Sequence, residues 1–247
     1  MRKFGLIGYP LSHSFSKKFF TQKFESEGIT NCIYDLYPLK NIEELKQLLA
    51  EDAELEGLNV TIPYKLDVMP FLHEIDDAAR KIGAVNCIKI INEGGQEILK
   101  GFNTDAYGFE ASLKPLLENG HNKALVLGDG GAAKAVKYVL DRLSIPFIIV
   151  TRTSTDNSIL YQDLTADILS EYTIVINTTP LGMSPDVISA PAIPYEFLTD
   201  RHLVYDLVYN PEETTFLNKS KLQGATIKNG LEMLYLQAER SWYIWNN

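Results

Sequence analysis

Cysteine, histidine and long hydrophobic runs are all scarce in this 247-residue sequence, and each shortage excludes a class of protein. Cys32 and Cys87 stand among apolar residues in expected strands, which indicates buried, reduced thiols rather than a disulfide framework. The four histidines lack the spacing of a zinc site, so no metal is expected. No run of about 18 or more apolar residues could span a bilayer, and the apolar run at the amino end is too short for a secretory signal. The sequence therefore predicts a cytoplasmic protein with no membrane partner.

Basic residues are fewer than acidic ones. The sequence has 23 Lys and Arg against 32 Asp and Glu, a formal net charge of −9 that repels a long phosphate backbone, so no nucleic acid partner is expected. The hydrophobic and charged fractions, 45% and 22%, are those of a globular protein. The length permits one large or two modest domains, and we expect two.

Apolar patterns in the first half of the chain predict alternating strands and helices. The first five expected elements, in the order strand, helix, strand, helix, strand, are residues 2–8, 14–28, 31–39, 41–52 and 55–62. A helix and a hairpin turning at residues 93–95 follow, and a further helix is expected from Asp105 to Leu117. These patterns predict a first α/β unit.

A second α/β unit is expected to start with residues 123–153, which read as strand, glycine turn, helix and strand over about 30 residues, the length of a βαβ unit. Later apolar runs predict more strands of a parallel sheet, because buried parallel strands are apolar throughout. The last segment, residues 230–245, is helical by its apolar spacing and could fold back onto the first unit.

The glycine turn has the pattern of a dinucleotide fingerprint. Gly128, Gly130 and Gly131 follow a strand and open a helix, and Ala133 is an allowed small residue at the third position. Arg152, at the end of the next strand, suits a 2′-phosphate, which favours NADP over NAD. A merely tight turn and a solvent-exposed arginine are the alternatives.

Four polar clusters in the first half fall where an expected strand ends or a helix begins, the places where ligands collect in open α/β sheets. Local structure offers another explanation, in which Ser14 caps a helix, Pro63 ends a strand and Asp105 caps the next helix. The clusters are residues 12–16, 59–65, 83–86 and 101–108.

Taken together, these clusters and several later segments resemble the shikimate dehydrogenase family. The matching segments occur in the family's order and cover nearly the whole chain. They are "GYPLSHSFS", "GLNVTIPYK", "GAVN", "GFNTD", "GDGGAAKA", "NTTPLGM", "DLVYNP" and "NGLEMLYLQA".

The resemblance implies an oxidoreductase that uses NADP to reduce 3-dehydroshikimate reversibly to shikimate, on the route to chorismate and the aromatic amino acids. It also implies two α/β domains. Residues 1–106, with 231–247, would form a substrate domain with a mixed sheet, and residues 107–230 a Rossmann-like NADP-binding domain. The C-terminal helix would pack back on the first domain.

The resemblance further assigns roles to individual residues. Hydride delivery to a ketone leaves negative charge on its oxygen, so a proton donor must lie within hydrogen-bond reach. Lys65 matches the family's catalytic lysine and Asp105 the aspartate paired with it. The matching substrate contacts are Ser14, Ser16, Thr61, Asn86, Tyr209 and Gln237, and the matching cofactor contacts are Gly128, Gly130, Gly131, Ala132, Arg152, Thr153, Leu207 and Gly230.

The sequence also departs from the family pattern. Lys17 follows Ser16 where the family has proline. Thr151 replaces the family's asparagine before Arg152, and Asp156 stands where a second basic residue is usual. A quinate/shikimate dehydrogenase using NAD is therefore an alternative, as is a nucleotide-sensing relative without turnover. Monomer and homodimer both stay open.

Overall fold

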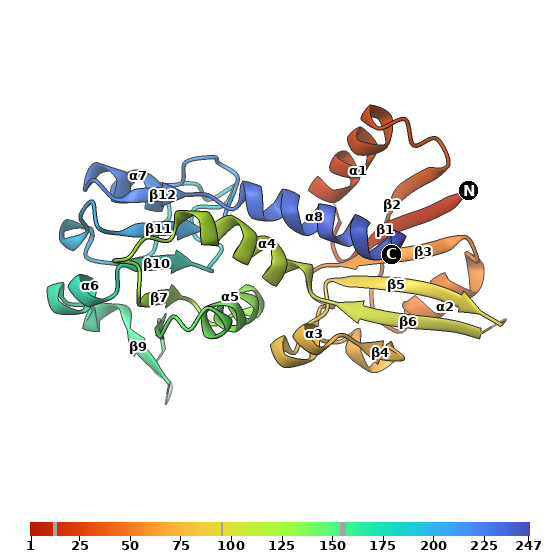
Figure 1. The fold of residues 1–247 in the computed structure, drawn as a ribbon, viewed down its shortest axis with the longest axis horizontal. Coiled ribbons are helices and arrows are strands. Elements are labelled where there is room, and N and C mark those ends of the chain that lie inside the picture. The colour runs from red at the N-terminus through yellow and green to blue at the C-terminus, as the bar shows by residue number, and fades with distance from the viewer. Residues whose placement is uncertain (12–13, 95, 154–156) are drawn as a thin grey trace. The chain divides into compact units, whose positions relative to one another are not determined.

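The computed structural model describes residues 1–11, 14–94, 96–153 and 157–247 (Figure 1). The chain divides into two compact units. Met1–Thr104 and Ala238–Asn247 form the first unit, and Asp105–Gln237 form the second. Within the described ranges, no helix is both long and apolar enough to cross a bilayer.

The first unit is built on a mixed six-stranded sheet in the order β2-β1-β3-β5-β6-β4. β1 runs parallel to β2 and β3, whereas β5 is antiparallel to both β3 and β6. The expected mixed sheet is thereby confirmed. Its strands are β1 (Arg2–Gly8), β2 (Cys32–Pro38), β3 (Leu55–Val60), β4 (Glu74–Ile75), β5 (Cys87–Glu93) and β6 (Gln96–Phe102), and its helices are α1 (Phe15–Ser26), α2 (Glu44–Glu51), α3 (Asp77–Ile82) and the 3₁₀ turn η1 (Met69–Phe71).

The C-terminal helix α8 (Leu231–Asn246) completes the core of this unit, as expected from the sequence. The Trp245 ring stacks on Phe4 with centroids 4.8 Å apart, and its indole N–H donates to the Ile88 carbonyl at 2.9 Å. Gly57 makes room for the indole, because a Cβ there would lie 2.3 Å from Trp245 Nε1. The last turn of α8 therefore fills a slot in the sheet.

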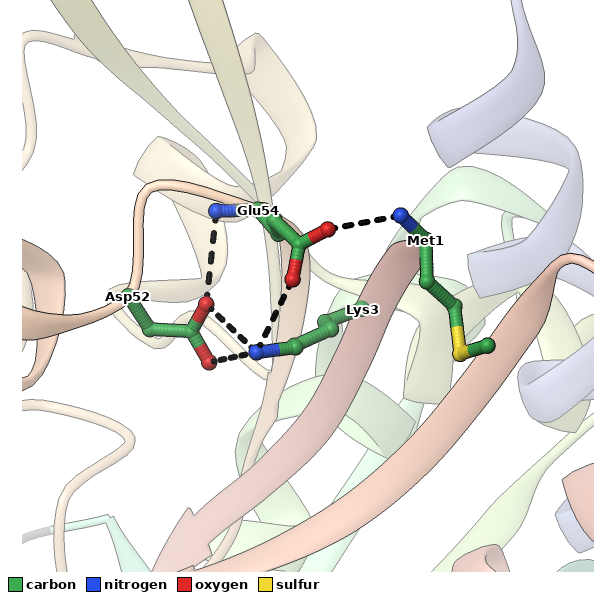
Figure 2. Close-up of polar contacts among 4 residues, drawn as sticks. All are labelled: Met1, Lys3, Asp52 and Glu54. Carbon is green, nitrogen blue, oxygen red and sulfur yellow. Dashed lines mark hydrogen bonds and ion pairs between the residues drawn. The ribbon is translucent and has the colours of Figure 1, made fainter.

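An ion-pair cluster fixes the start of β1 (Figure 2). The Met1 amine lies 2.6 Å from Glu54, and Lys3 Nζ lies 3.0 Å from both Asp52 oxygens and 3.2 Å from Glu54. Hydrogen bonding, first to Asp52 and then to Glu54, raises the pKa of Lys3. The cluster joins β1 to the turn before β3, but partly exposed pairs of this kind contribute little stability.

The second unit is built on an all-parallel sheet in the order β12-β11-β10-β7-β8-β9, which confirms the Rossmann-like expectation. The central strands β7, β10 and β11 are buried at every position, as their apolar runs predict. Its strands are β7 (Ala124–Leu127), β8 (Phe147–Thr151), β9 (Ser158–Leu160), β10 (Ile174–Asn177), β11 (Leu203–Asp206) and β12 (Thr226–Lys228), and its helices are α4 (Thr104–Leu113), α5 (Gly131–Arg142), α6 (Ala166–Glu171) and α7 (Thr215–Leu222), with the 3₁₀ turns η2 (Lys114–Leu116), η3 (Tyr161–Asp163) and η4 (Tyr195–Phe197).

Helix α4 differs from its expected bounds at both ends. It begins at Thr104, so Asp105 lies inside the first turn and is not the helix cap. It ends at Leu113, and Pro115 in the following 3₁₀ turn has no N–H to continue the α-helical pattern. Ser112 and Tyr205 join this helix to β11 through a buried hydroxyl pair 2.7 Å apart.

Both cysteines are buried and free, as expected. Burial raises the pKa of Cys87 to about 12, so this thiol stays protonated and unreactive at neutral pH.

Candidate functional site

The glycine turn after β7 has a backbone that only glycine adopts readily. Gly128 has φ +98°, and a Cβ there would lie 2.7 Å from Thr179 Cγ2. Its N–H donates to the Val150 carbonyl at 2.8 Å, which holds the turn against the end of β8. Gly128 is therefore required by both conformation and packing.

The next glycines lie where an anion could approach the backbone. A Cβ at Gly130 or Gly131 would meet no atom within 4 Å, and Gly130 is the N-cap of α5 without a side-chain hydrogen bond. Ala132 follows in the first turn of this helix. Backbone N–H groups and the positive end of the helix dipole favour a phosphate there, so the turn fits the pyrophosphate of a dinucleotide.

Asp129 places a carboxylate within this turn. Its side chain forms an ion pair with Lys137, two turns along α5. Lys137 thereby offsets a charge that would otherwise repel an anion.

Beside the glycine turn lies a pocket of about 490 Å³. Arg152 and Thr153, both exposed, line it immediately after β8. The Thr151 hydroxyl donates to the Thr153 carbonyl at 2.8 Å and lies 2.9 Å from Ser158 Oγ, so with its one proton already used it accepts from Ser158. Thr151, which replaces the family's asparagine, thus shapes the turn that carries Arg152. Asp156, where the family has a second base, is outside the described residues.

A buried polar network fixes the loops after β10 and β11. Asp206 accepts from Asn177 Nδ2 at 2.9 Å and from the Thr214 hydroxyl at 2.6 Å, and also from the Val208 N–H at 3.0 Å. Asn177 Oδ1 in turn accepts from the backbone and hydroxyl of Thr179 at 3.0 and 2.6 Å. Burial raises the pKa of Asp206 to about 6 despite the hydrogen bonds it accepts.

Leu207 and Tyr209 lie on the loop after β11, and Gly230 lies on the turn after β12. A Cβ at Gly230 would lie 2.1 Å from the Leu207 carbonyl oxygen, so only glycine allows the two backbones to pass. Tyr209 keeps 37% of its surface exposed. Because all strands of this sheet are parallel, these loops and the glycine turn share its carboxyl edge.

In the first unit, polar residues of three clusters lie at one edge of the mixed sheet, within residues 59–65, 83–86 and 101–104. β1, β3 and β6 end there, and β5, being antiparallel to β3 and β6, begins there. Thr61 follows β3, and its N–H donates to the Ile7 carbonyl at 2.9 Å. Lys65 is half-buried in the next turn, and its carbonyl accepts from the Val85 N–H at 2.8 Å.

Asn86 is buried at the start of β5 and joins two of the clusters. Its Oδ1 accepts the Thr104 N–H at 2.6 Å, and its Nδ2 donates to the Thr104 hydroxyl at 3.0 Å. These contacts leave one amide hydrogen of Asn86 for a ligand. Thr104 opens α4, and Asp105, half-buried, is the next residue.

Asn59 braces the end of β3 from within the sheet. Its amide accepts from the Tyr34 hydroxyl at 2.9 Å and donates to Ser241 of α8 at 2.9 Å. These contacts give Asn59 a structural role.

The two serines lie at the start of α1. Ser14 is its N-cap and accepts from the Lys17 N–H at 3.4 Å, which confirms the capping interpretation. Ser16 is half-buried in the first turn of the helix. Burial raises the pKa of Tyr34, and a hydrogen bond from Ser16 opposes this shift. Ser12 and His13 of the same motif are outside the described residues.

Gln237 is buried on α8, with 8% of its surface exposed. Its Nε2 donates to the Leu234 carbonyl one turn back at 3.0 Å. Gln237 closes the second unit in sequence, and Ala238 begins the part of α8 that belongs to the first.

Several residues that line the pocket beside the glycine turn were given no role from the sequence, and Tyr161 is the aromatic residue among them. Tyr161 follows β9, a strand that was not predicted. A strand of three residues is too short to show a period of two. The sequence shows Tyr161 only as one aromatic residue some way after Arg152, and such a residue does not by itself indicate a ligand site.

Several known proteins with similar sequences or structures are described as shikimate dehydrogenases. A family model for the shikimate dehydrogenase substrate binding domain matches residues 6–88. Shikimate dehydrogenase (NADP(+)) of Carboxydothermus hydrogenoformans is 39% identical over 98% of this chain and 90% of that protein. The crystal structure of a chorismate mutase/shikimate 5-dehydrogenase fusion protein from Clostridium acetobutylicum is 38% identical with a TM-score of 0.86, over 100% of this chain and 91% of that one. Shikimate 5-dehydrogenase from Thermus thermophilus, solved with NADP(H) and shikimate, is 30% identical with a TM-score of 0.84, over 99% and 93% of the two chains.

Proposed function

The chain belongs to the shikimate dehydrogenase family, and we propose that it catalyses the reversible NADP-dependent reduction of 3-dehydroshikimate to shikimate. This is an oxidoreductase acting on a CH–OH group, on the route to chorismate and the aromatic amino acids. The observation that carries the proposal is 39% identity to a shikimate dehydrogenase (NADP(+)) over 98% of the chain. The pocket beside the glycine turn supports the choice of cofactor.

NADP, when bound, supplies or accepts the hydride. The backbone of Gly128, Gly130, Gly131 and Ala132 would hold its pyrophosphate, since Cβ atoms at Gly130 and Gly131 would meet no protein atom. Arg152 and Thr153 would bind the 2′-phosphate, because a guanidinium and a hydroxyl both donate to its oxygens. Leu207 and Gly230 would line the nicotinamide end.

Lys65 and Asp105 would handle the proton at the reacting oxygen. The Lys65 ammonium would donate a hydrogen bond to the ketone oxygen and deliver a proton as negative charge develops. The Asp105 carboxylate would accept from the substrate hydroxyl and fix its orientation. The backbone around both residues is fixed by hydrogen bonds, which supports these roles. Lys65 is half-buried, and its carbonyl accepts from the Val85 N–H. Asp105 follows Thr104, whose N–H donates to Asn86.

The substrate carries a carboxylate and several hydroxyls, so its site needs several uncharged side chains that donate or accept hydrogen bonds. Hydrogen bonds from hydroxyl and amide groups to an ion are each worth about 1.5–3 kcal/mol, so an arginine is not needed. Of the donors, those in the first unit follow or precede strands at one edge of its sheet. The proposed substrate contacts are Ser14, Ser16, Thr61, Asn86, Tyr209 and Gln237.

The proposal is tested by mixing purified protein with NADPH and 3-dehydroshikimate and following NADPH absorbance. We expect the absorbance to fall, with shikimate as the product identified by mass spectrometry. Parallel assays with NAD, and with quinate and shikimate as substrates for oxidation, separate this reading from a quinate/shikimate dehydrogenase. No turnover with any combination would contradict the proposal and favour a nucleotide-sensing protein.

The state of the protein in solution is part of the same proposal. We expect a monomer or homodimer acting in the cytoplasm on small molecules, consistent with the net charge of −9. Light scattering coupled to size exclusion gives the mass of the assembly, and cell fractionation gives its location.

A further inference from the structure

Strand β9 places one aromatic side chain next to Arg152. β8 and β9 pair in parallel, with Thr151 opposite Leu160 as the last pair. Parallel strands advance together, so the residues that follow this pair, Arg152 and Tyr161, leave the sheet side by side at the same edge. Both line the pocket of about 490 Å³ beside the glycine turn.

The ring of Tyr161 is partly buried by packing. It packs against the buried core of the second unit, a cluster that includes Leu164 and Ile193. Burial raises the pKa of the Tyr161 phenol, and the charge of Arg152 opposes that shift. The hydroxyl is therefore a protonated donor at neutral pH, in the electric field of the guanidinium.

We propose that Tyr161 is a specificity-determining residue for the cofactor, whose hydroxyl donates a hydrogen bond to the 2′-phosphate that Arg152 pairs with. This inference rests on the proposed use of NADP. A 2′-phosphate presents three strong acceptor oxygens, and one guanidinium engages two of them bidentately. Among the described residues lining the pocket, Arg152 is the one cation. Each phosphate oxygen accepts more than one hydrogen bond, so the Tyr161 hydroxyl is a donor in addition to that of Thr153.

The test compares wild-type protein with Tyr161→Phe, which keeps the ring and its packing and removes the hydroxyl. Calorimetry measures binding of NADP, NAD and adenosine 2′,5′-bisphosphate to each protein. We expect the variant to bind NADP and the bisphosphate about tenfold more weakly, because the lost hydrogen bond is to a charged group, and to bind NAD as wild type does. Unchanged NADP affinity, or an equal loss for NADP and NAD, would overturn the inference.

Tyr195→Phe is the matched control. The Tyr195 hydroxyl donates to the Pro191 carbonyl at 2.7 Å, and this tyrosine is not among the residues that line the pocket. We expect it to lower the melting temperature without changing the preference for NADP. A change in that preference equal to the one in Tyr161→Phe would count against a specific role for Tyr161.

The binding data also separate this inference from the proposed function. Turnover of 3-dehydroshikimate with NADPH, together with unchanged NADP binding in Tyr161→Phe, would refute the role of Tyr161 alone. Wild-type protein that binds neither dinucleotide would refute both.

Discussion

Asn86 holds Thr104 through both ends of its amide, accepting the backbone N–H at 2.6 Å and donating to the hydroxyl at 3.0 Å. Thr104 is the first residue of α4, and its N–H has no acceptor within the helix. Asn86 therefore supplies the acceptor for the first N–H of α4. Asp105, which the sequence offers as a cap, is the next residue and lies in the first turn of the helix.

Asn86→Ala should lower both stability and turnover. The buried Thr104 N–H would lose its acceptor, at a cost of about 1–3 kcal/mol, and the turn that carries Asp105 would loosen. Denaturant unfolding and kcat measure the two effects. Asn59→Ala is the control, because Asn59 is similarly buried, and its side chain bonds Tyr34, Ser241 and the backbone carbonyl of Asn86 but not Thr104. Equal loss of kcat in both variants would mean that general destabilisation explains the result.

Lys65→Ala should lower kcat by roughly 10²–10⁴-fold, the usual effect of removing a general acid. NADP affinity, measured by calorimetry, should stay as in the unmodified protein. Lys81→Ala, at an exposed position of α3, should keep full turnover. A Lys65→Ala protein with normal kcat would remove Lys65 from the mechanism.

Arg152→Ala should lower NADP affinity by about 10–100-fold and leave NAD affinity unchanged, because charge-assisted hydrogen bonds are worth about 1.5–3 kcal/mol. The KM for shikimate should be nearly intact. Steady-state kinetics with both cofactors measure these effects. An equal loss of NAD affinity would show that Arg152 does not recognise the 2′-phosphate.

Two glycine substitutions should distinguish a glycine that the backbone conformation requires from one that only leaves space for a ligand. Gly128→Ala places a Cβ 2.7 Å from Thr179 on a backbone with φ +98°, so it should lower the free energy of unfolding by more than about 1 kcal/mol. Gly131→Ala adds a Cβ that meets no atom within 4 Å at the start of α5, so stability should be unchanged or slightly higher. Chemical denaturation measures both. Equal destabilisation would contradict this division of roles.

Asp206 should make stability depend on pH in an unusual direction. Burial raises its pKa from an ordinary 3.8 to about 6, so the folded state binds the proton more tightly than the unfolded state. Its contribution to stability is therefore fully present below about pH 4 and is lost as the pH rises through about 6, by up to about 3 kcal/mol. Wild-type stability relative to Asp206→Asn should fall across this window, as unfolding at several pH values would reveal.

Asp141→Asn, at an exposed position of α5, is the control for that measurement. Its stability relative to wild type should change little between pH 4 and pH 6.5. A flat difference for Asp206→Asn over the same range would contradict the raised pKa.

The sequence predicted most of the architecture, because long strands and helices carry strong periodic signals. The parallel core strands and the glycine turn could be identified from apolar runs and spacing alone. β9 could not, since a three-residue strand has no period to detect, and Tyr161 was missed with it. The acceptor for the first N–H of α4 could not be identified either, because Asn86 lies far back in the sequence and meets Thr104 only in the folded protein.

The roles assigned to individual side chains depended on the family resemblance. Motif spacing alone left Ser14 as either a helix cap or a ligand contact, and the structure confirms the cap. A side chain at a strand end is placed by tertiary structure, so the sequence identifies the residue type but not the group it faces. For this reason the catalytic roles of Lys65 and Asp105 stay predictions, and the Lys65→Ala kinetics above test the first of them.

The slot that Gly57 leaves for Trp245 has a consequence for synthesis on the ribosome. The last residues of the chain complete the unit that the first residues begin. While translation is under way, the nascent first unit lacks its closing helix, and Phe4 is left without its stacking partner. The second unit, whose residues are contiguous, can form earlier, so the half of the protein made first is the half that finishes folding last.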